Sequence, residues 1–230
     1  MDLKIKDVAE LLNVSETTIR RWLTEGKIPA YRLHHQYRFS RIEIENWMMS
    51  FKMSKEQLQG QRKKKASVGA WPHSYGLYQA LSRGGVYNSI EASTKEEVIR
   101  KTMDKVALEL KVDPAVMTDL LLDRENLMAT GLNNGIAVPH TRDYLHKGAT
   151  DVVSCVCLRR PLSWGSLDGK DVHTLFFLFA TDDKRHLQLL AKIAHLSSSE
   201  DFIDFVSTKN PTQEMLLDYV KQWETQAAVR

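Results

Sequence analysis

The segment 52–75 constrains the architecture of this 230-residue chain more than any other part of the sequence. It is rich in Lys, Gln, Ser and Gly, it includes the basic run RKKK at 62–65, and it contains little that could form a core. Treated as flexible coil, about 20 residues span on the order of 25 Å. We therefore predict two folded units, 1–51 and 76–225, joined by a basic flexible linker at 52–75.

The two sides of the linker differ in charge. Through residue 75 there are 14 Lys and Arg against 8 Asp and Glu, a net charge of +6, whereas the remainder has 18 against 21, a net charge of −3. A basic head on a slightly acidic body indicates two units with different partners.

The composition is that of an ordinary globular protein, with 43% hydrophobic and 27% charged residues. No apolar run approaches the roughly 18–20 residues of a membrane span, and the N-terminus lacks a secretory signal pattern. The two cysteines, Cys155 and Cys157, would point to the same face of a strand, where a disulfide between them would be strained. We expect two buried thiols and a cytoplasmic location, with no membrane partner.

The first thirty residues predict two short helices. Apolar side chains from Ile5 to Leu12 recur at helical spacing, and Ser15 can cap a second helix with its hydroxyl. Gly26, followed by Pro29, is a stop signal for that second helix. Two short helices joined by a tight turn have the geometry of a helix-turn-helix.

The residues that follow predict a hairpin and a third helix. Polar and apolar side chains alternate in 31–33 and 37–39, which favours a β-hairpin, or wing, with its tip at 34–36. Ser40 and Glu43 form a capping box, and the helix after them carries an apolar stripe through Phe51. The head is thus predicted to be a small, mainly α winged helix-turn-helix.

Polar side chains on the second helix and on the wing are candidates for DNA contact. Arginine can fork onto guanine or onto phosphate, and threonine hydroxyls can do either near a helix N-terminus. The candidates are Thr17, Thr18, Arg20, Arg21, Arg32 and Arg38.

The run KDVAELLNVSETTIRRWLTEGKIPAYRL, followed by YRFSRIEIENWM, resembles the winged helix-turn-helix of the excisionase and MerR-type DNA-binding families. The resemblance implies a recognition helix at about 16–24 in the major groove, with the wing near the DNA backbone or minor groove. At the wing tip, His34 and His35 stand where many relatives carry Gly. Helix-turn-helix readers usually pair over two half-sites, so we expect a homodimer. Small units of this kind also serve as protein-docking modules, which is the alternative.

Beyond the linker, helical and strand patterns alternate. Thr94 caps one amphipathic helix, and Asp113 with Pro114 opens another that we expect to run through Leu121. The runs 151–158 and 172–180 are rich in β-formers, and the second is apolar enough to be central in a sheet. This pattern predicts an α/β domain with a mixed sheet flanked by helices. Later helices are expected at about 184–197, 200–207 and 211–223.

One histidine, His140, is expected at the end of a strand, directly after a proline that restricts the backbone leading to it. The turn 133–135 can accept unusual backbone angles, Arg124 is expected to precede a strand leading to that turn, and His186 opens a helix. Two imidazoles and a guanidinium suit phosphoryl transfer, with one imidazole as the nucleophile. The sequence shows no P-loop, metal-ligand spacing or nucleophile elbow, so no metal or other cofactor is expected.

The stretches RENLMATGLNNGIAVPH and HLQLLAKIAHL resemble the enzyme IIA domain of the fructose/mannitol and nitrogen-regulatory class in the bacterial phosphotransferase system, over about 75–225. The resemblance implies that His140 receives a phosphoryl group from an HPr-type phosphohistidine carrier. It assigns the family's arginine to Arg124 and the second active-site histidine to His186. Thr141 and Asn133 stand where relatives often have Gly.

Trp164 and the remaining histidines match no reactive motif and are expected to be packed or exposed. These histidines are His34, His35, His73, His146, His173 and His195.

The leading hypothesis is a regulatory phosphotransferase-system protein that joins a DNA-binding head to a phosphohistidine domain, for transcriptional or metabolic regulation. A first alternative is a phosphoryl carrier in sugar uptake. A second is an unphosphorylated domain that docks onto partner proteins. Whether the phosphohistidine intermediate makes the chain an enzyme stays open at this point.

Overall fold

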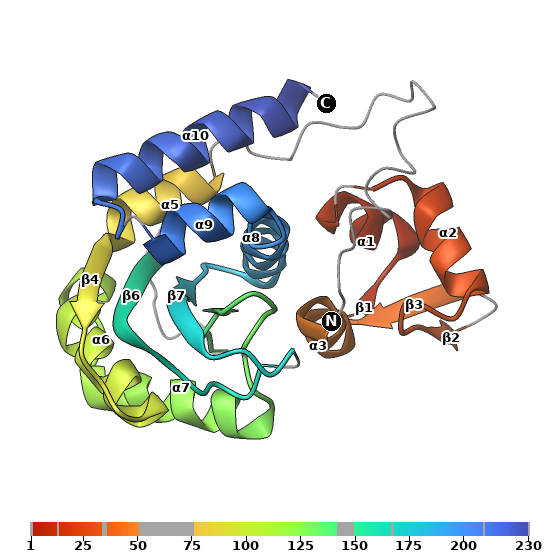
Figure 1. The fold of residues 1–230 in the computed structure, drawn as a ribbon. Coiled ribbons are helices and arrows are strands. Elements are labelled where there is room, and N and C mark those ends of the chain that lie inside the picture. Colours follow the sequence, from red (N-terminus) through yellow and green to blue (C-terminus); the bar gives the residue numbers. More distant parts are fainter. Residues whose placement is uncertain are drawn as a thin grey trace. The chain divides into compact units, whose positions relative to one another are not determined.

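The computed structural model describes residues 2–12, 14–33, 36–50, 76–141, 150–166, 168–208 and 210–229 (Figure 1). The predicted linker 52–75, the wing-tip residues 34–35, His73 and His146 lie outside the described residues. The pattern of contacts divides the chain into two compact units. The first is Met1–Ser74 with Trp223–Arg230, and the second is Tyr75–Gln222. We call residues 2–50 the head and Tyr75–Gln222 the body.

The head consists of three helices and a three-stranded antiparallel sheet of order β1-β3-β2. The short strand β1 was not predicted, whereas the two helices, the wing and the third helix are confirmed. In chain order the elements are β1 (Asp2–Leu3), α1 (Ile5–Leu11), α2 (Glu16–Thr24), β2 (Tyr31–Leu33), β3 (Gln36–Ser40) and α3 (Arg41–Ser50).

Local signals set the bounds of α2. The Ser15 hydroxyl accepts a hydrogen bond from the amide of Thr18 at 3.1 Å, which satisfies one of the unpaired donors at the helix start. Just beyond the helix, Gly26 adopts φ of +65°, a left-handed conformation that glycine accepts without strain. Ile19 and Trp22 face the small core of the head, so α2 presents Thr17, Arg20 and Arg21 outward.

The body is an α/β unit with a mixed four-stranded sheet of order β4-β6-β7-β5. Strand β4 (Val86–Ile90) runs parallel to β6 (Val152–Leu162), which pairs antiparallel with β7 (Val172–Phe179). Strand β5 (Ile136–Ala137) is parallel to β7. The apolar run predicted to be central is β7, one of the two interior strands, so this prediction is confirmed.

Helices cover both faces of this sheet (Figure 1). Core side chains of α6 and α7 pack with one face of β6 and β7, and Phe202 of α9 stacks on Phe176 across the other face. The helices are α5 (Gly76–Gly84), α6 (Lys95–Leu110), α7 (Pro114–Leu127), α8 (Asp183–Leu196), α9 (Glu200–Thr208) and the part of α10 (Gln213–Val229) up to Gln222. The predicted fold class is confirmed.

The structure corrects the prediction for Arg124, which was expected to precede a strand. Helix α7 continues past Leu121 to Leu127 and contains Arg124 in its last turn. Leu121, Arg124 and Glu125 are all buried, at the i, i+3, i+4 spacing of one helical face. The buried face of α7 therefore continues with two charged residues beyond Leu121, where the sequence had predicted the helix to end. Residues 128–135, between α7 and β5, contain no strand, and Gly131 forms an isolated bridge with Ala137.

Candidate functional site

His140 lies shortly after the two-residue strand β5, where it forms an isolated parallel bridge with Leu178 of β7, and the backbone is fixed on both sides of β5. The turn before β5 uses Asn134 at φ 66° and Gly135 at φ 73°. A side chain at Gly135 would also collide with the His173 ring, because its Cβ would lie 2.5 Å from Cδ2. After β5, the Pro139 carbonyl accepts a hydrogen bond from the Leu178 amide at 3.0 Å. The backbone therefore delivers the His140 ring from the edge of the sheet beside β7.

The main chain also orients the His140 ring. Its Nδ1 lies 2.7 Å from the carbonyl oxygen of Val138. Because a carbonyl oxygen can only accept, this bond requires the proton on Nδ1 and leaves the lone pair of the neutral ring on Nε2.

The structure brings His140 and His186 together, as predicted. Their ring centroids are 5.0 Å apart and the rings meet edge to face at 63°. Both side chains are buried, with exposed fractions of 0% and 1%. Two imidazoles in this arrangement can share one bound group, with one ring as nucleophile and the other as a hydrogen-bonding partner.

His186 is positioned by the first turn of α8. The Asp182 carboxylate caps this helix by accepting from the Arg185 amide at 2.8 Å. The Arg185 guanidinium in turn donates from Nε to the buried carboxylate of Asp151 at 2.7 Å. Asp151 also accepts from the amide and the hydroxyl of Thr181, each at 3.0 Å. The start of α8 is thereby tied to the start of β6.

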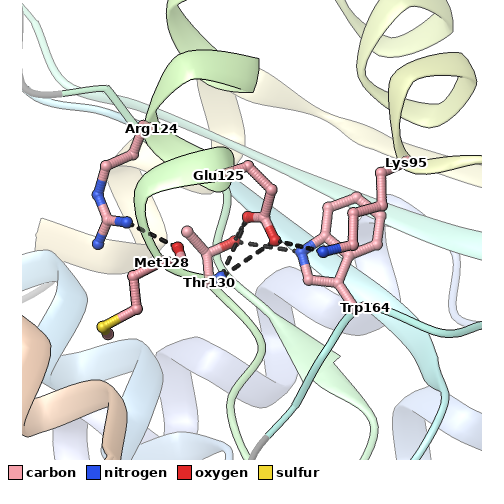
Figure 2. A network of polar contacts seen from close by, with 6 residues as sticks. All are labelled: Lys95, Arg124, Glu125, Met128, Thr130 and Trp164. Atoms are coloured by element: carbon pink, nitrogen blue, oxygen red, sulfur yellow. Dashed lines mark hydrogen bonds and ion pairs between the residues drawn. The ribbon is translucent and has the colours of Figure 1, made fainter.

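Arg124 is held at the C-terminal end of α7. Its side chain is only 3% exposed, and Nη1 donates to the Met128 carbonyl at 2.9 Å (Figure 2). A guanidinium is a favourable partner for the carbonyl-rich end of a helix. The predicted cation is thus buried on the element that precedes the His140 segment.

Next to Arg124, Glu125 forms a buried polar network that the sequence did not reveal (Figure 2). Its carboxylate, 5% exposed, accepts from Lys95 Nζ at 2.9 Å and from the amide of Thr130 at 3.1 Å. The Thr130 hydroxyl also bonds Glu125 and accepts from Trp164 Nε1 at 3.2 Å. Trp164 is fully buried, so its predicted packing role is confirmed. In the sequence, Glu125 is only a Glu next to an Arg, and that neighbourhood does not predict the network.

The two cysteines are buried free thiols on β6, as predicted. The Cys155 thiol donates a hydrogen bond to Cys157, and this bond, together with burial, raises the pKa of Cys155. Hydrogen bonds from Cys155 and Thr174 lower the pKa of Cys157, against the effect of burial. Neither sulfur is exposed at the surface, so neither is presented as a nucleophile.

The other described histidines occupy packing positions. His173 is half-buried beside the turn that precedes β5, and its Nδ1 lies 2.9 Å from the Thr174 hydroxyl. Burial lowers the pKa of His173, which favours the neutral ring. His195 is half-buried in the last turn of α8.

On α2 of the head, the predicted contact residues are presented outward. Thr17, Arg20 and Arg21 are exposed, and within the described residues the two arginines form long, exposed ion pairs with Glu16 and Glu25. Such pairs contribute little stability, so the guanidinium groups can exchange them for another anion. The Thr18 hydroxyl, half-buried, lies 2.9 Å from that of Ser15 and is part of the helix cap.

On the wing, both predicted arginines form hydrogen bonds with neighbouring side chains. Arg32 is exposed, donates to the Tyr37 hydroxyl at 3.0 Å and lies over its ring at 5.0 Å. Arg38 donates to the Gln36 side chain at 2.9 Å.

Among the described residues, no helix is long and apolar enough to cross a membrane.

Comparison with known families matches both units. The family model described as "Phosphoenolpyruvate-dependent sugar phosphotransferase system, EIIA 2" matches residues 80–222. A family model described as "Helix-turn-helix domain" matches residues 3–51.

Individual relatives match the body. The chain is 33% identical over 148 residues to a nitrogen regulatory protein of Pseudomonas aeruginosa, covering 63% of this chain and 94% of that protein. It is 27% identical over 148 residues to a mannitol-specific phosphotransferase enzyme IIA component of Staphylococcus aureus, covering 60% and 94%. The structure of nitrogen regulatory protein IIA-Ntr from Neisseria meningitidis superimposes with a TM-score of 0.56 at 23% identity, covering 62% of this chain and 97% of that one.

Proposed function

This chain belongs to the EIIA type 2 family of the phosphoenolpyruvate-dependent sugar phosphotransferase system, and from this premise we propose that His140 accepts a phosphoryl group. The donor in this proposal is an HPr-type phosphohistidine carrier. The head, a helix-turn-helix domain, is proposed to bind DNA, so that the chain acts as a regulator.

The observation that carries the proposal for the body is the bond between His140 Nδ1 and the Val138 carbonyl. With the proton on Nδ1, the lone pair of Nε2 attacks the phosphorus of the donor's phosphohistidine. The donor's N–P bond breaks, and its electron pair returns to the donor imidazole. The His140 ring becomes cationic as the new N–P bond forms, and the Val138 carbonyl stabilises the charge on the Nδ1 side.

The neighbouring groups have distinct proposed roles. The His186 ring, 5.0 Å from that of His140 between centroids, is proposed to donate a hydrogen bond to a phosphoryl oxygen. Arg124 is proposed to supply positive charge for the phosphoryl oxygens in the transition state, in which little covalent chemistry is left to the protein.

DNA binding by the head is supported by its exposed arginines Arg20, Arg21 and Arg32. The net charge of +6 through residue 75, most of which comes from the adjoining basic segment 52–75, adds to this support. Recognition helix α2 is proposed to enter the major groove with Arg20 and Arg21, while Arg32 and Arg38 of the wing contact the backbone or the minor groove. A homodimer over two half-sites completes the proposal.

Regulation is favoured over a role in sugar uptake by two observations. The relatives described above include a protein named as a nitrogen regulatory protein, and this chain carries a helix-turn-helix domain.

The test combines two measurements on the full chain. Purified carrier and phosphoenolpyruvate-dependent enzyme should transfer label to the chain, with the label on His140 by mass spectrometry. DNA capture from the source genome should then recover specific fragments. Label without DNA would favour the uptake alternative, and DNA without label would favour a docking regulator.

A further inference from the structure

We infer that Glu125 is a positioning residue for His140, acting through Thr130 and the main chain of Val138. The inference rests on the proposed role of His140 as phosphoryl acceptor. It concerns a residue outside the histidine motif and apart from the arginine and histidine that accompany it in that proposal.

The carboxylate of Glu125 is buried and fully engaged. A buried charge is costly unless it is paired and hydrogen-bonded. Lys95 supplies the opposite charge at 2.9 Å, and the other bonds all go to Thr130, through its amide at 3.1 Å and through its hydroxyl. The network therefore fixes one residue, Thr130, relative to the end of α7.

Thr130 in turn positions the strand that leads to His140. Its carbonyl accepts from the Val138 amide at 3.0 Å. Two residues on, the Leu132 amide donates to the Ile136 carbonyl at 2.7 Å, and Gly131 bridges Ala137. This short antiparallel pairing places Val138 with respect to Thr130.

Val138 then reaches the reacting ring. Its amide is held by the Thr130 carbonyl, and its own carbonyl accepts from His140 Nδ1 at 2.7 Å. Hydrogen bonds thus connect the Glu125 carboxylate to the side of the His140 ring opposite Nε2. Trp164 supports the same chain by donating to the Thr130 hydroxyl.

Loss of this anchor has a chemical consequence. If Thr130 moves, the Val138 carbonyl moves with it and the Nδ1–H bond weakens. The tautomer with its proton on Nε2 then gains population, and that tautomer has no lone pair on the nitrogen proposed to attack. A displacement of about 1 Å at a reacting centre can cost about 100-fold in rate.

The test measures the His140 tautomer directly. In unphosphorylated full-length chain with ¹⁵N-labelled histidine rings, long-range ¹⁵N–¹H correlation distinguishes protonated from unprotonated ring nitrogens. The His140 signal is identified by its loss in His140→Gln. Wild type should show the proton on Nδ1, and Glu125→Ala should shift population toward Nε2–H and slow phosphoryl uptake by about 10- to 100-fold.

Three further variants separate positioning from general stability. Leu121→Ala truncates a buried side chain on the same helix, about one turn before Glu125, and should leave the tautomer unchanged. Glu125→Gln keeps an oxygen that can accept from Thr130 and should retain most of the Nδ1–H population. Thr130→Val removes the hydroxyl with little change in shape, and it reports on the same chain if Glu125→Ala does not fold.

The outcomes are decisive in either direction. An unchanged tautomer in Glu125→Ala, or an equal shift in Leu121→Ala, overturns the inference. If Glu125→Ala does not fold, an unchanged His140 tautomer in Thr130→Val overturns the inference instead. If wild type accepts no phosphoryl group, the proposed function fails, and the tautomer measurement on unphosphorylated protein still tests the positioning role by itself.

Discussion

In the head, the side chains proposed to contact DNA are mostly exposed, whereas in the body the side chains proposed to handle a phosphoryl group are buried. Arg20 and Arg21 make weak surface ion pairs that a DNA phosphate could replace. His140 and Arg124 are held by main-chain carbonyls within hydrogen-bond distance. In the head, charged side chains are thus exposed on a small domain. In the body, buried contacts hold the site residues in a defined geometry.

This difference predicts two kinds of mutational response. Exposed cations contribute separately, so substitutions in the head should act in roughly additive steps. Buried groups that act as a unit are strongly non-additive, so single changes in the body should remove most of the activity.

The largest effect is expected for His140→Gln. Gln cannot form the phosphohistidine, so label transfer from the phosphorylated carrier should disappear. Gln is used because His140 is buried, and a smaller side chain would also leave a cavity. The matched control is His173→Gln, a half-buried histidine outside the proposed site. Wild-type uptake by His140→Gln would refute the site assignment.

The next effect is expected for Arg124→Met, which keeps an unbranched, largely apolar stem but removes the guanidinium and its charge. Phosphoryl uptake should slow by about 10²- to 10³-fold, since developing charge on the phosphoryl oxygens needs a positioned donor. Rates would be followed by rapid-quench labelling. Arg159→Met, at an exposed arginine paired with Glu91, is the control. Equal rates for both variants would show that Arg124 has no role in transfer.

In the head, Arg20→Ala should lower DNA affinity by about tenfold, which is within the about 1–3 kcal/mol expected for one base contact. A phosphate contact would instead weaken binding to all sequences and reduce the salt slope by about one. Fluorescence anisotropy at several salt concentrations distinguishes the two. Arg100→Ala, an exposed arginine of the body, should change neither quantity. If Arg20→Ala together with Arg21→Ala lost far more than the sum, the contrast between the units would break down.

The smallest effect compares the same change in both units. Ser15 caps α2 and Thr94 caps α6, each by accepting from the amide three residues on. Ser15→Ala and Thr94→Ala should each destabilise their own unit by about 1 kcal/mol. Chemical denaturation with separate probes for each unit measures both. A change at Ser15 that destabilised the body equally would mean that the two units unfold together.

The elements with strong local signals were predictable from the sequence. Caps at Ser15 and Thr94, the apolar run of β7 and the proline before His140 are each encoded within a few neighbouring residues. Strand β4 was not individually predicted because VYNSI is short and only partly apolar, and it forms by pairing with β6, more than sixty residues away.

The candidate site was predictable only in part. The two histidines could be paired through the resemblance, and their ring contact is what the structure adds. The network of Glu125 could not be predicted, because it joins Lys95, Thr130 and Trp164 through tertiary contacts that leave no periodic pattern. Arg124 was misplaced for a related reason, since its burial extends α7 where the sequence suggested a strand.

The group that fixes the His140 tautomer is a main-chain carbonyl, and this affects how the site can evolve. Replacing Val138 with another residue leaves its carbonyl in place, so ordinary point mutation at that position cannot delete the acceptor. Only a change that moves the backbone can do so, such as proline at 138, which would also remove the amide held by Thr130. A descendant protein that had lost His140 would therefore retain the Val138 carbonyl, and a single reversion to histidine could restore the ring in its original tautomer.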